Sequence, residues 1–162
     1  MGRKVQITQM RRADVKTVFG LQSEFEAFLQ GLTANTRSTN AAARRRLFLR
    51  YGFGRKPAFK CLIAKMGGVP VGYICYHLGF DPDEMSGPVV YVIDLFVSSG
   101  ARGLGIGKAL MNKVAGICRE EGGIAVYTCV WKKNRKAIGF YRSIGADWVT
   151  DVPLMQWPRS RW

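Results

Sequence analysis

Hydrophobic residues recur along the 162-residue chain at two different spacings, and each spacing predicts one type of secondary structure. Apolar positions every three to four residues, the period of an amphipathic helix, predict helices over about residues 14–29 and 105–121. Helices are also expected over about 41–51, an arginine-rich and more exposed segment, and 134–143, which Gly145 follows. Short apolar runs rich in β-branched and aromatic residues predict strands at residues 5–8, 59–66, 69–78, 89–97, 124–130, 148–149 and 154–157. The chain is therefore expected to contain both helices and strands.

The order of these elements indicates how they pack. Two of the strands flank Gly67-Gly68, a two-residue glycine turn that is typical of a hairpin. The full order predicts an α/β protein of the α+β type, with helices packed on a largely antiparallel sheet. Because 162 residues is close to the commonest domain size, we expect a single domain over residues 1–162.

The composition agrees with a folded domain, with 48% hydrophobic and 22% charged residues. No apolar run approaches the roughly 20 residues of a membrane-spanning helix, and residues 1–6 lack the apolar core of a signal peptide. We therefore expect a cytoplasmic protein with no membrane partner. Cys61, Cys75, Cys118 and Cys129 lie far apart in apolar stretches, which favours buried thiols and no metal site.

A formal net charge of +14 is the unusual feature of the composition. Such a charge attracts phosphates, nucleic acid or anionic membrane surfaces, but it does not identify a partner. The basic residues are spread along the whole chain, so a solvated basic surface is the simpler interpretation, and nucleic acid is not the favoured partner. The loop 81–88 gathers three of the eleven acidic residues.

The segment Arg102-Gly103-Leu104-Gly105-Ile106-Gly107 lies between a predicted strand and a predicted helix. Glycines at this position let a phosphate approach the free N–H groups of the helix N-terminus, and Arg102 and Lys108 add positive charge. A Walker loop would need Ser or Thr after Lys108, where this chain has Ala109. A dinucleotide-binding loop would follow the first strand of a parallel sheet, whereas this loop follows a hairpin.

Two sequence motifs, one in this loop and one downstream of it, make the interpretation of the loop more specific. The first, Arg/Gln-x-x-Gly-x-Gly/Ala, is filled by Arg102, Gly105 and Gly107. The second, Val-x-x-x-Asn-x-x-Ala-x-x-x-Tyr-x-x-x-Gly, is matched by Val130, Asn134, Ala137, Tyr141 and Gly145. In these motifs the sequence resembles the GCN5-related N-acetyltransferase (GNAT) superfamily. The resemblance implies about four helices around a mostly antiparallel mixed sheet of six to seven strands, splayed between the fourth and fifth.

The resemblance also implies that the chain uses acetyl-CoA as co-substrate, without a metal. The pantetheine arm would lie along backbone groups of the fourth strand, and the pyrophosphate would lie on the glycine loop. The implied cofactor-binding residues are Leu95, Phe96, Val97, Arg102, Gly103, Leu104, Gly105, Ile106, Gly107, Lys108, Asn134, Ala137 and Tyr141. Asn134 serves equally well as the N-cap of its own helix, and a plain buried strand would explain 95–97.

For catalysis, the resemblance implies direct attack of an amine on the thioester, with Tyr141 as the acid that protonates the departing thiolate. A phenol of pKa about 10 is a suitable donor to a thiolate whose thiol has a pKa of about 8.5. The alternative for Tyr141 is a half-buried packing residue.

The general base is less well defined by the sequence. Residues 93–97 are similar to the Glu-Asp-hydrophobic-aromatic-Val of polyamine acetyltransferases, but Ile93 replaces the Glu that serves as base there. Asp94 is therefore the best-placed acid for this role, ahead of Glu24 and Glu26. His77, the only histidine, is a further candidate that fits a structural role as well.

The implied reaction is acetyl transfer to a primary amine of a small molecule or a protein. The net charge repels cationic acceptors unless local acidic residues attract them; these are Asp81, Asp83, Glu84, Asp94 and Asp151. Trp148 and Trp157 are candidates for lining the acceptor pocket. Homodimers are common in the family. The alternative is a non-catalytic module that binds CoA or nucleic acid on the same fold, although an intact Tyr141 argues against it.

Overall fold

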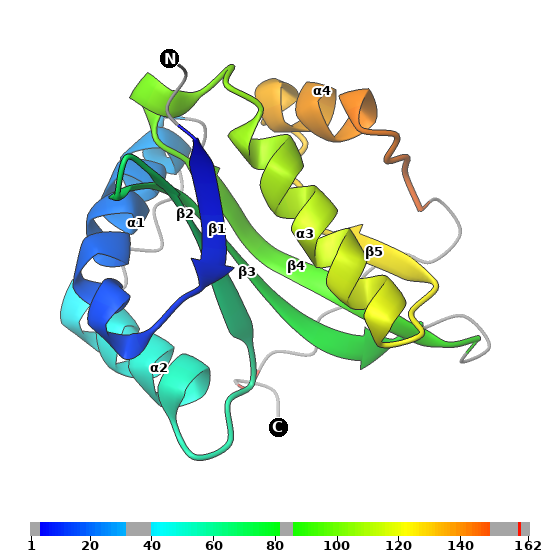
Figure 1. Ribbon diagram of the computed structural model, residues 1–162, viewed down its shortest axis with the longest axis horizontal. Coiled ribbons are helices and arrows are strands. Elements are labelled where there is room, and N and C mark those ends of the chain that lie inside the picture. Colours follow the sequence, from blue (N-terminus) through cyan, green and yellow to red (C-terminus); the bar gives the residue numbers. More distant parts are fainter. Residues whose placement is uncertain (1–3, 32–39, 82–85, 150–158, 160–162) are drawn as a thin grey trace.

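The computed structural model describes residues 4–31, 40–81, 86–149 and 159. Within these ranges four α-helices pack on a five-stranded sheet (Figure 1). The helices are α1 (Val15–Gln30), α2 (Ala41–Phe53), α3 (Ile106–Glu120) and α4 (Arg135–Ser143). The strands are β1 (Val5–Gln9), β2 (Lys60–Met66), β3 (Val69–Phe80), β4 (Pro88–Val97) and β5 (Ala125–Thr128). Two short 3-10 turns, Arg12–Asp14 and Ser99–Ala101, precede α1 and the glycine loop.

The strands lie in the sheet in the order in which they occur in the chain. β1, β2, β3 and β4 pair with antiparallel neighbours, and β5 pairs with β4 in parallel. A parallel pair needs a crossover connection, which α3 provides. The hairpin between β2 and β3 turns at Gly67 and Gly68, whose φ angles of 58° and 82° are those of a tight hairpin turn. The predicted hairpin and mixed sheet are confirmed.

Each face of the sheet carries its own hydrophobic core, because successive strand residues point to opposite faces. On β2, Cys61 and Ile63 pack with α1, whereas Leu62 and Ala64 pack with α3. Figure 1 shows α1 and α2 on one side of the sheet and α3 on the other. The structure is therefore a three-layered arrangement of helix, sheet and helix.

A β-bulge at Ile93 changes which residues of β4 face which layer. Cys75 on β3 lies opposite Asp94, and the next residue, Tyr76, lies opposite Val92, so Ile93 has no partner on β3. An extra residue in one strand reverses the alternation of side chains beyond it. Asp94 and the buried Phe96 consequently lie on the α1 side of the sheet.

The pairing of β4 with β5 stops halfway along β4. It joins Val89–Val92 to Ala125–Thr128, while β4 continues to Val97. The backbone groups of the last five residues of β4 that face the β5 side are therefore not used by a described neighbouring strand. This separation is the splay that the sequence comparison with the superfamily predicted.

The expected sheet of six to seven strands is not matched, since the described residues form five. Trp148 and Val149, predicted as a short strand, have irregular backbone, and their side chains are 47% and 54% exposed. A strand forms only where a neighbour satisfies its N–H and C=O groups, and neither residue pairs with a described strand. The last predicted strand, 154–157, lies outside the described residues.

Two further predictions concern the cysteines and the membrane. Cys61, Cys75 and Cys118 are buried thiols as predicted, but Cys129 is exposed because it lies just beyond the end of β5. In the described part of the chain, no helix combines the length and the hydrophobicity that crossing a bilayer requires.

Candidate active site

The glycine loop leads into α3 through two residues in the left-handed conformation. Gly103 and Gly105 have φ angles of 77° and 75°, which side-chain-bearing residues rarely adopt. Gly105 is the N-cap, and its carbonyl accepts the first intrahelical bond, from the Ala109 N–H. The N–H groups of the first turn have no acceptor within the helix, and no side chain caps them. The N-terminus of α3 is thus suited to bind a phosphate.

Gly107 and Arg102 have structural roles in the same loop. A Cβ on Gly107 would lie 3.3 Å from the Phe140 ring, so its small size lets α3 approach α4 closely. The Arg102 Nε donates a hydrogen bond to the Val97 carbonyl at 3.0 Å, which ties the loop to the end of β4. The Arg102 guanidinium lies 5.2 Å from the Phe28 ring centroid. Arg102 therefore fixes the loop as well as adding charge.

A cavity of about 420 Å³ opens beside this loop. Its walls come from the end of β4, the N-terminus of α3, helix α4 and one side of α1. Of the thirteen residues predicted to bind the cofactor, twelve border it: Leu95, Phe96, Val97, Arg102, Gly103, Gly105, Ile106, Gly107, Lys108, Asn134, Ala137 and Tyr141. The exception is Leu104, which does not border the cavity and whose side chain is 57% exposed.

Seven residues that border the cavity were not predicted from the sequence: Phe25, Phe28, Ala101, Lys136, Phe140, Ser143 and Ile144. The helical spacing of Phe25 and Phe28 predicted core positions, and such positions look the same whether they face a core or a cavity. Lys136 lies inside the Asn-x-x-Ala pattern, where a basic residue near a phosphate-binding loop was a usable signal.

Tyr141 lies on α4, half-buried, and borders the cavity. Burial raises the pKa of its phenol, a hydrogen bond with Thr128 lowers it, and the charge of Asp94 raises it. Because the net shift is upward, the hydroxyl keeps its proton at neutral pH. Tyr141 can therefore donate a proton to an anion that forms in the cavity.

Asp94 lies beyond the bulge, on the α1 side of β4, and does not itself border the cavity. Burial, and secondarily the charge of Glu26, raise the pKa of its carboxyl group to about 6. Asp94 is thus ionised at neutral pH but is a better proton acceptor than an ordinary aspartate. Since the charge of Asp94 also raises the pKa of Tyr141, these two groups interact across β4.

Residues 25–146 match the family model described as Acetyltransferase (GNAT) family. The chain belongs to the GNAT family. It is 32% identical over 109 residues to Thialysine N-epsilon-acetyltransferase of Sus scrofa, an alignment covering 62% of this chain and 63% of the relative. It is 33% identical to Spermidine/spermine N(1)-acetyltransferase-like protein 1 of Homo sapiens, over 60% of this chain and 15% of that protein. The chain therefore spans less than two thirds of the length of these curated relatives.

Solved structures show the same GNAT fold. An integron cassette protein from V. cholerae superposes with a TM-score of 0.77 at 24% identity, covering 97% of this chain and 94% of that chain. An aminoglycoside N-acetyltransferase in complex with CoA superposes with a TM-score of 0.75 at 18% identity, covering 98% and 97%. At these identities the likeness concerns the fold alone.

The other candidate residues of this GNAT chain lie outside the cavity. His77 stacks on Tyr91 with ring centroids 5.1 Å apart, in the half of the sheet before the bulge. Glu24 accepts a hydrogen bond from the Ser99 N–H at 2.8 Å, which fixes the loop after β4. Trp148 borders a smaller cavity, of about 60 Å³, that Tyr141 also lines. The described residues form no His, Cys, Asp or Glu group suited to a metal.

Two of the five acidic residues that were predicted to attract cations lie within the described residues of the GNAT chain. Asp81 is buried at the end of β3, where its carboxylate accepts a hydrogen bond from the Tyr127 hydroxyl at 2.5 Å. Asp83, Glu84 and Asp151, like Trp157, lie outside the described residues. Asp94 is thus the member of the set that the described structure places near the cavity.

Asn134 caps α4 and borders the cavity at the same time, so its two predicted roles can be separated by experiment. Its Oδ1 accepts a hydrogen bond from the Ala137 N–H at 3.1 Å. Asn40 caps α2 in the same way, accepting from the Ala42 N–H at 2.9 Å, but lies outside the cavity wall. We expect Asn134→Ala and Asn40→Ala each to lower the free energy of unfolding by about 1 kcal/mol.

If Asn134 also contacts acetyl-CoA, as the family resemblance implies, only Asn134→Ala should raise the KM for acetyl-CoA, by about fivefold, because one such hydrogen bond contributes about 1 kcal/mol. Thermal unfolding and steady-state kinetics on the two variants measure both effects. An unchanged KM in Asn134→Ala would leave capping as its sole role.

Proposed function

We propose that the chain transfers an acetyl group from acetyl-CoA to a primary amine of a small molecule or a protein. The proposal depends on the 420 Å³ cavity, where the unpaired end of β4, the N-terminus of α3 and the Tyr141 side chain meet. Each of these three features suits one part of an acyl-CoA: the amide-containing arm, the pyrophosphate and the departing thiolate.

The residues present fit this co-substrate. Apart from the Val97 carbonyl, which accepts a hydrogen bond from Arg102, backbone groups of 93–97 on the β5 side are available to pair with the amides of an extended arm, because β5 ends at Thr128. The first turn of α3 offers N–H groups to phosphate, and Lys108 and Lys136 place positive charge at the same wall. The rings of Phe25, Phe96 and Phe140 make part of the cavity wall apolar.

In the proposed reaction acetyl-CoA supplies an activated acyl group with a thiolate as leaving group. Tyr141, protonated at neutral pH, donates its proton to that thiolate. Asp94, whose pKa is raised to about 6 and which lies outside the cavity wall, accepts the proton lost by the amine through a water. The relatives named for thialysine and for spermidine/spermine support an amine as acceptor.

The cofactor half of the proposal can be tested at Gly105 with two side chains of almost equal size. Asn and Asp both tolerate the left-handed conformation, so Gly105→Asn and Gly105→Asp should strain the backbone at residue 105 to a similar extent. Only Asp adds a negative charge at the helix N-terminus, where the pyrophosphate is expected to bind. We expect Gly105→Asp to bind CoA about tenfold more weakly than Gly105→Asn in calorimetric titration.

The acceptor half needs a screen for free-thiol release from acetyl-CoA with amino acids, polyamines, aminoglycosides and peptides. Amine-dependent release by the wild-type chain supports the proposal.

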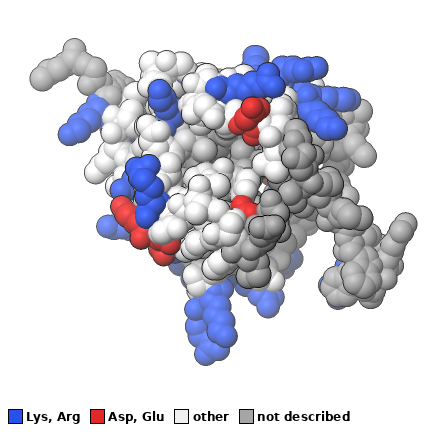
Figure 2. Space-filling view, turned by 90° about the vertical axis from the view of Figure 1, so that its right-hand side faces the viewer, with Lys and Arg blue, Asp and Glu red and all other residues white. Residues whose placement is uncertain are grey.

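Figure 2 shows lysine and arginine side chains along the upper edge of the face that carries α4. If no amine supports release while RNA binds in a salt-dependent manner, the chain is instead a binding module.

A further inference from the structure

Glu24 of α1 binds the segment of chain that leads into the glycine loop. Its Oε1 accepts a hydrogen bond from the Ser99 N–H at 2.8 Å, although the two residues are 75 positions apart in the sequence. Ser99 begins the 3-10 turn Ser99–Ala101, and the N-cap of that turn, Ser98, makes no side-chain capping bond. N–H groups at the start of a helical turn have no acceptor within the turn. Glu24 therefore supplies from α1 the acceptor that the local residues do not.

Arg102 makes a second contact between this segment and α1. Its guanidinium carbon lies 5.2 Å from the ring centroid of Phe28 on α1 and 5.6 Å from that of Phe96 on β4. A guanidinium within about 6 Å of an aromatic ring centroid is attracted to the ring. Phe28 follows Glu24 by four residues, so both contacts come from one face of α1. The chain before Gly103 is thus attached to α1 at two points.

Gly103 and Gly105, the two left-handed residues of the loop, have open space where side chains would stand. Apart from the residues next to each glycine, no described atom lies within 4 Å of an added Cβ. Glycine also loses more conformational freedom on ordering than any other residue. The conformation of the loop therefore depends on what holds its two ends. These supports are helix α3 on one side and the contacts of Ser99 and Arg102 with α1 on the other.

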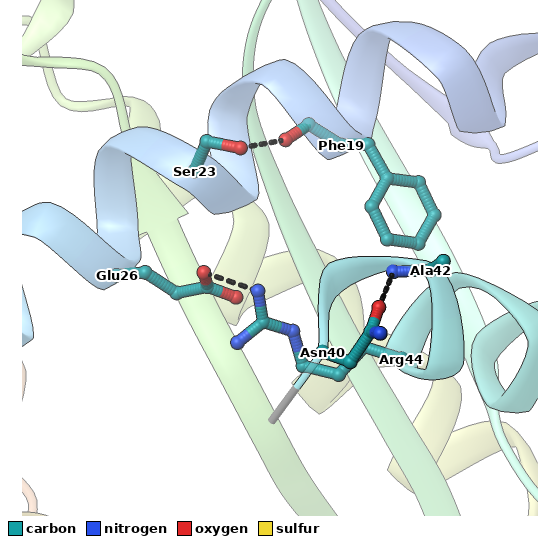
Figure 3. A network of polar contacts seen from close by, with 6 residues as sticks. All are labelled: Phe19, Ser23, Glu26, Asn40, Ala42 and Arg44. Atoms are coloured by element: carbon teal, nitrogen blue, oxygen red, sulfur yellow. Dashed lines mark hydrogen bonds and ion pairs between the residues drawn. The ribbon is translucent and has the colours of Figure 1, made fainter. Parts of the chain in front are cut away.

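The polar side chains on either side of Glu24 contact other parts of the protein. Ser23 donates a hydrogen bond to the Phe19 carbonyl within α1, and Glu26 pairs with Arg44 of α2 (Figure 3). Glu24 and Glu26 thus carry the same charge on the same helix but contact different elements. This difference makes Glu26 a matched reference for the role of Glu24.

We propose that Glu24 is a positioning residue for the co-substrate, which holds the glycine loop in the conformation that binds the pyrophosphate of acetyl-CoA. The inference rests on the proposed function and adds to it a residue that does not border the cavity. When a binding conformation is populated only part of the time, the apparent dissociation constant rises by the inverse of the populated fraction. Loss of the Glu24 carboxylate lets the loop leave this conformation, so CoA binds more weakly although no contact with CoA is removed.

Calorimetric titration of CoA into three variants tests this role. Glu24→Ala removes the acceptor and is expected to raise the Kd for CoA about tenfold, because a hydrogen bond to a charged group is lost. Glu24→Gln keeps an acceptor oxygen without the charge and should bind CoA at least as tightly as the wild type. Glu26→Ala removes the same charge but leaves the Ser99 contact, so its Kd should stay within about twofold of the wild-type value.

The direction of the change separates positioning from simple electrostatics. A carboxylate that acted only through its charge would repel the phosphates, so Glu24→Ala and Glu24→Gln would both bind CoA more tightly than the wild type. Unchanged or tighter binding in Glu24→Ala would therefore overturn the inference. Weakening of the same size in Glu26→Ala would contradict it as well, since the cause would then be a general loss of α1 packing.

Hydrogen exchange gives a second measurement that needs no ligand. Amides of residues 99–105 should exchange about tenfold faster in Glu24→Ala than in Glu26→Ala or the wild type, because the loop opens more often. Equal exchange rates in the two variants would show that Glu24 does not hold the loop. A wild-type chain that failed to bind CoA would overturn the proposed function, and the exchange rates alone would then decide the role of Glu24.

Discussion

Replacing Tyr141 with Phe is expected to lower turnover about 100-fold, because the departing thiolate then lacks its proton donor. The affinity for acetyl-CoA should change by less than about threefold, since the ring remains in the cavity wall and the lost hydroxyl accounts for one weak interaction. Stopped-flow or steady-state measurement of thiol release, with calorimetric titration of CoA, separates the two quantities.

Tyr91→Phe is the matched control for this variant. Tyr91 is also half-buried, and its hydroxyl donates to the Phe80 carbonyl at 3.3 Å, outside the cavity. Its loss should leave turnover unchanged. If Tyr141→Phe retained wild-type turnover with the best acceptor, Tyr141 would be a packing residue and the donor would have to be another group.

Asp94→Asn is expected to lower kcat/KM about 100-fold at neutral pH, because the amide cannot accept the proton of the attacking amine. In the wild type, protonation of Asp94 should reduce kcat/KM as the pH falls through about 6. This acidic limb should be absent from the pH profile of Asp94→Asn. Its persistence in the variant would assign the limb to a different group.

Asp94→Asn is expected to increase the stability of the fold although it lowers the activity. The pKa of Asp94 is about 6 when folded, above its usual value of 3.8, so the folded chain holds this proton more tightly than the unfolded chain. Stability is therefore lost as the pH rises from about 4 to about 6. At pH 7 we expect Asp94→Asn to be more stable than the wild type by about 2 kcal/mol.

Asp14→Asn is the control for the sign of this effect. Asp14 pairs with Lys65 at 2.8 Å and accepts the Arg11 N–H, and these contacts lower its pKa. The stabilisation by ionised Asp14 is therefore fully present above the usual aspartate pKa of 3.8 and is lost as the pH falls through the lowered pKa of the folded state. Asp14→Asn should thus be less stable than the wild type at pH 7. Chemical unfolding of both variants at pH 7 measures this contrast, and repeating it down to about pH 3 follows the loss of the Asp14 contribution.

Local sequence patterns predicted the elements that depend on neighbours in the chain. The hairpin at Gly67-Gly68 and the helix that follows Gly105 formed as expected, because turn conformation and helical period are set within a few residues. The prediction of a short strand at 148–149 was wrong because a strand, unlike a turn or a helix, depends on residues far away in the chain. A strand is completed by a partner that can lie anywhere in the chain, and two apolar residues do not specify one.

The sequence by itself determined the glycine loop before α3 and the place of Tyr141 on α4, because glycines, a helix N-terminus and motif spacing are properties of consecutive residues. Only the tertiary structure decided that Phe25 and Phe28 line the cavity and that Glu26 meets Arg44. It also decided, through the bulge at Ile93, that Asp94 faces α1. These features depend on which residues lie opposite one another after folding, and a bulge or a helix contact is set by the fit between distant segments.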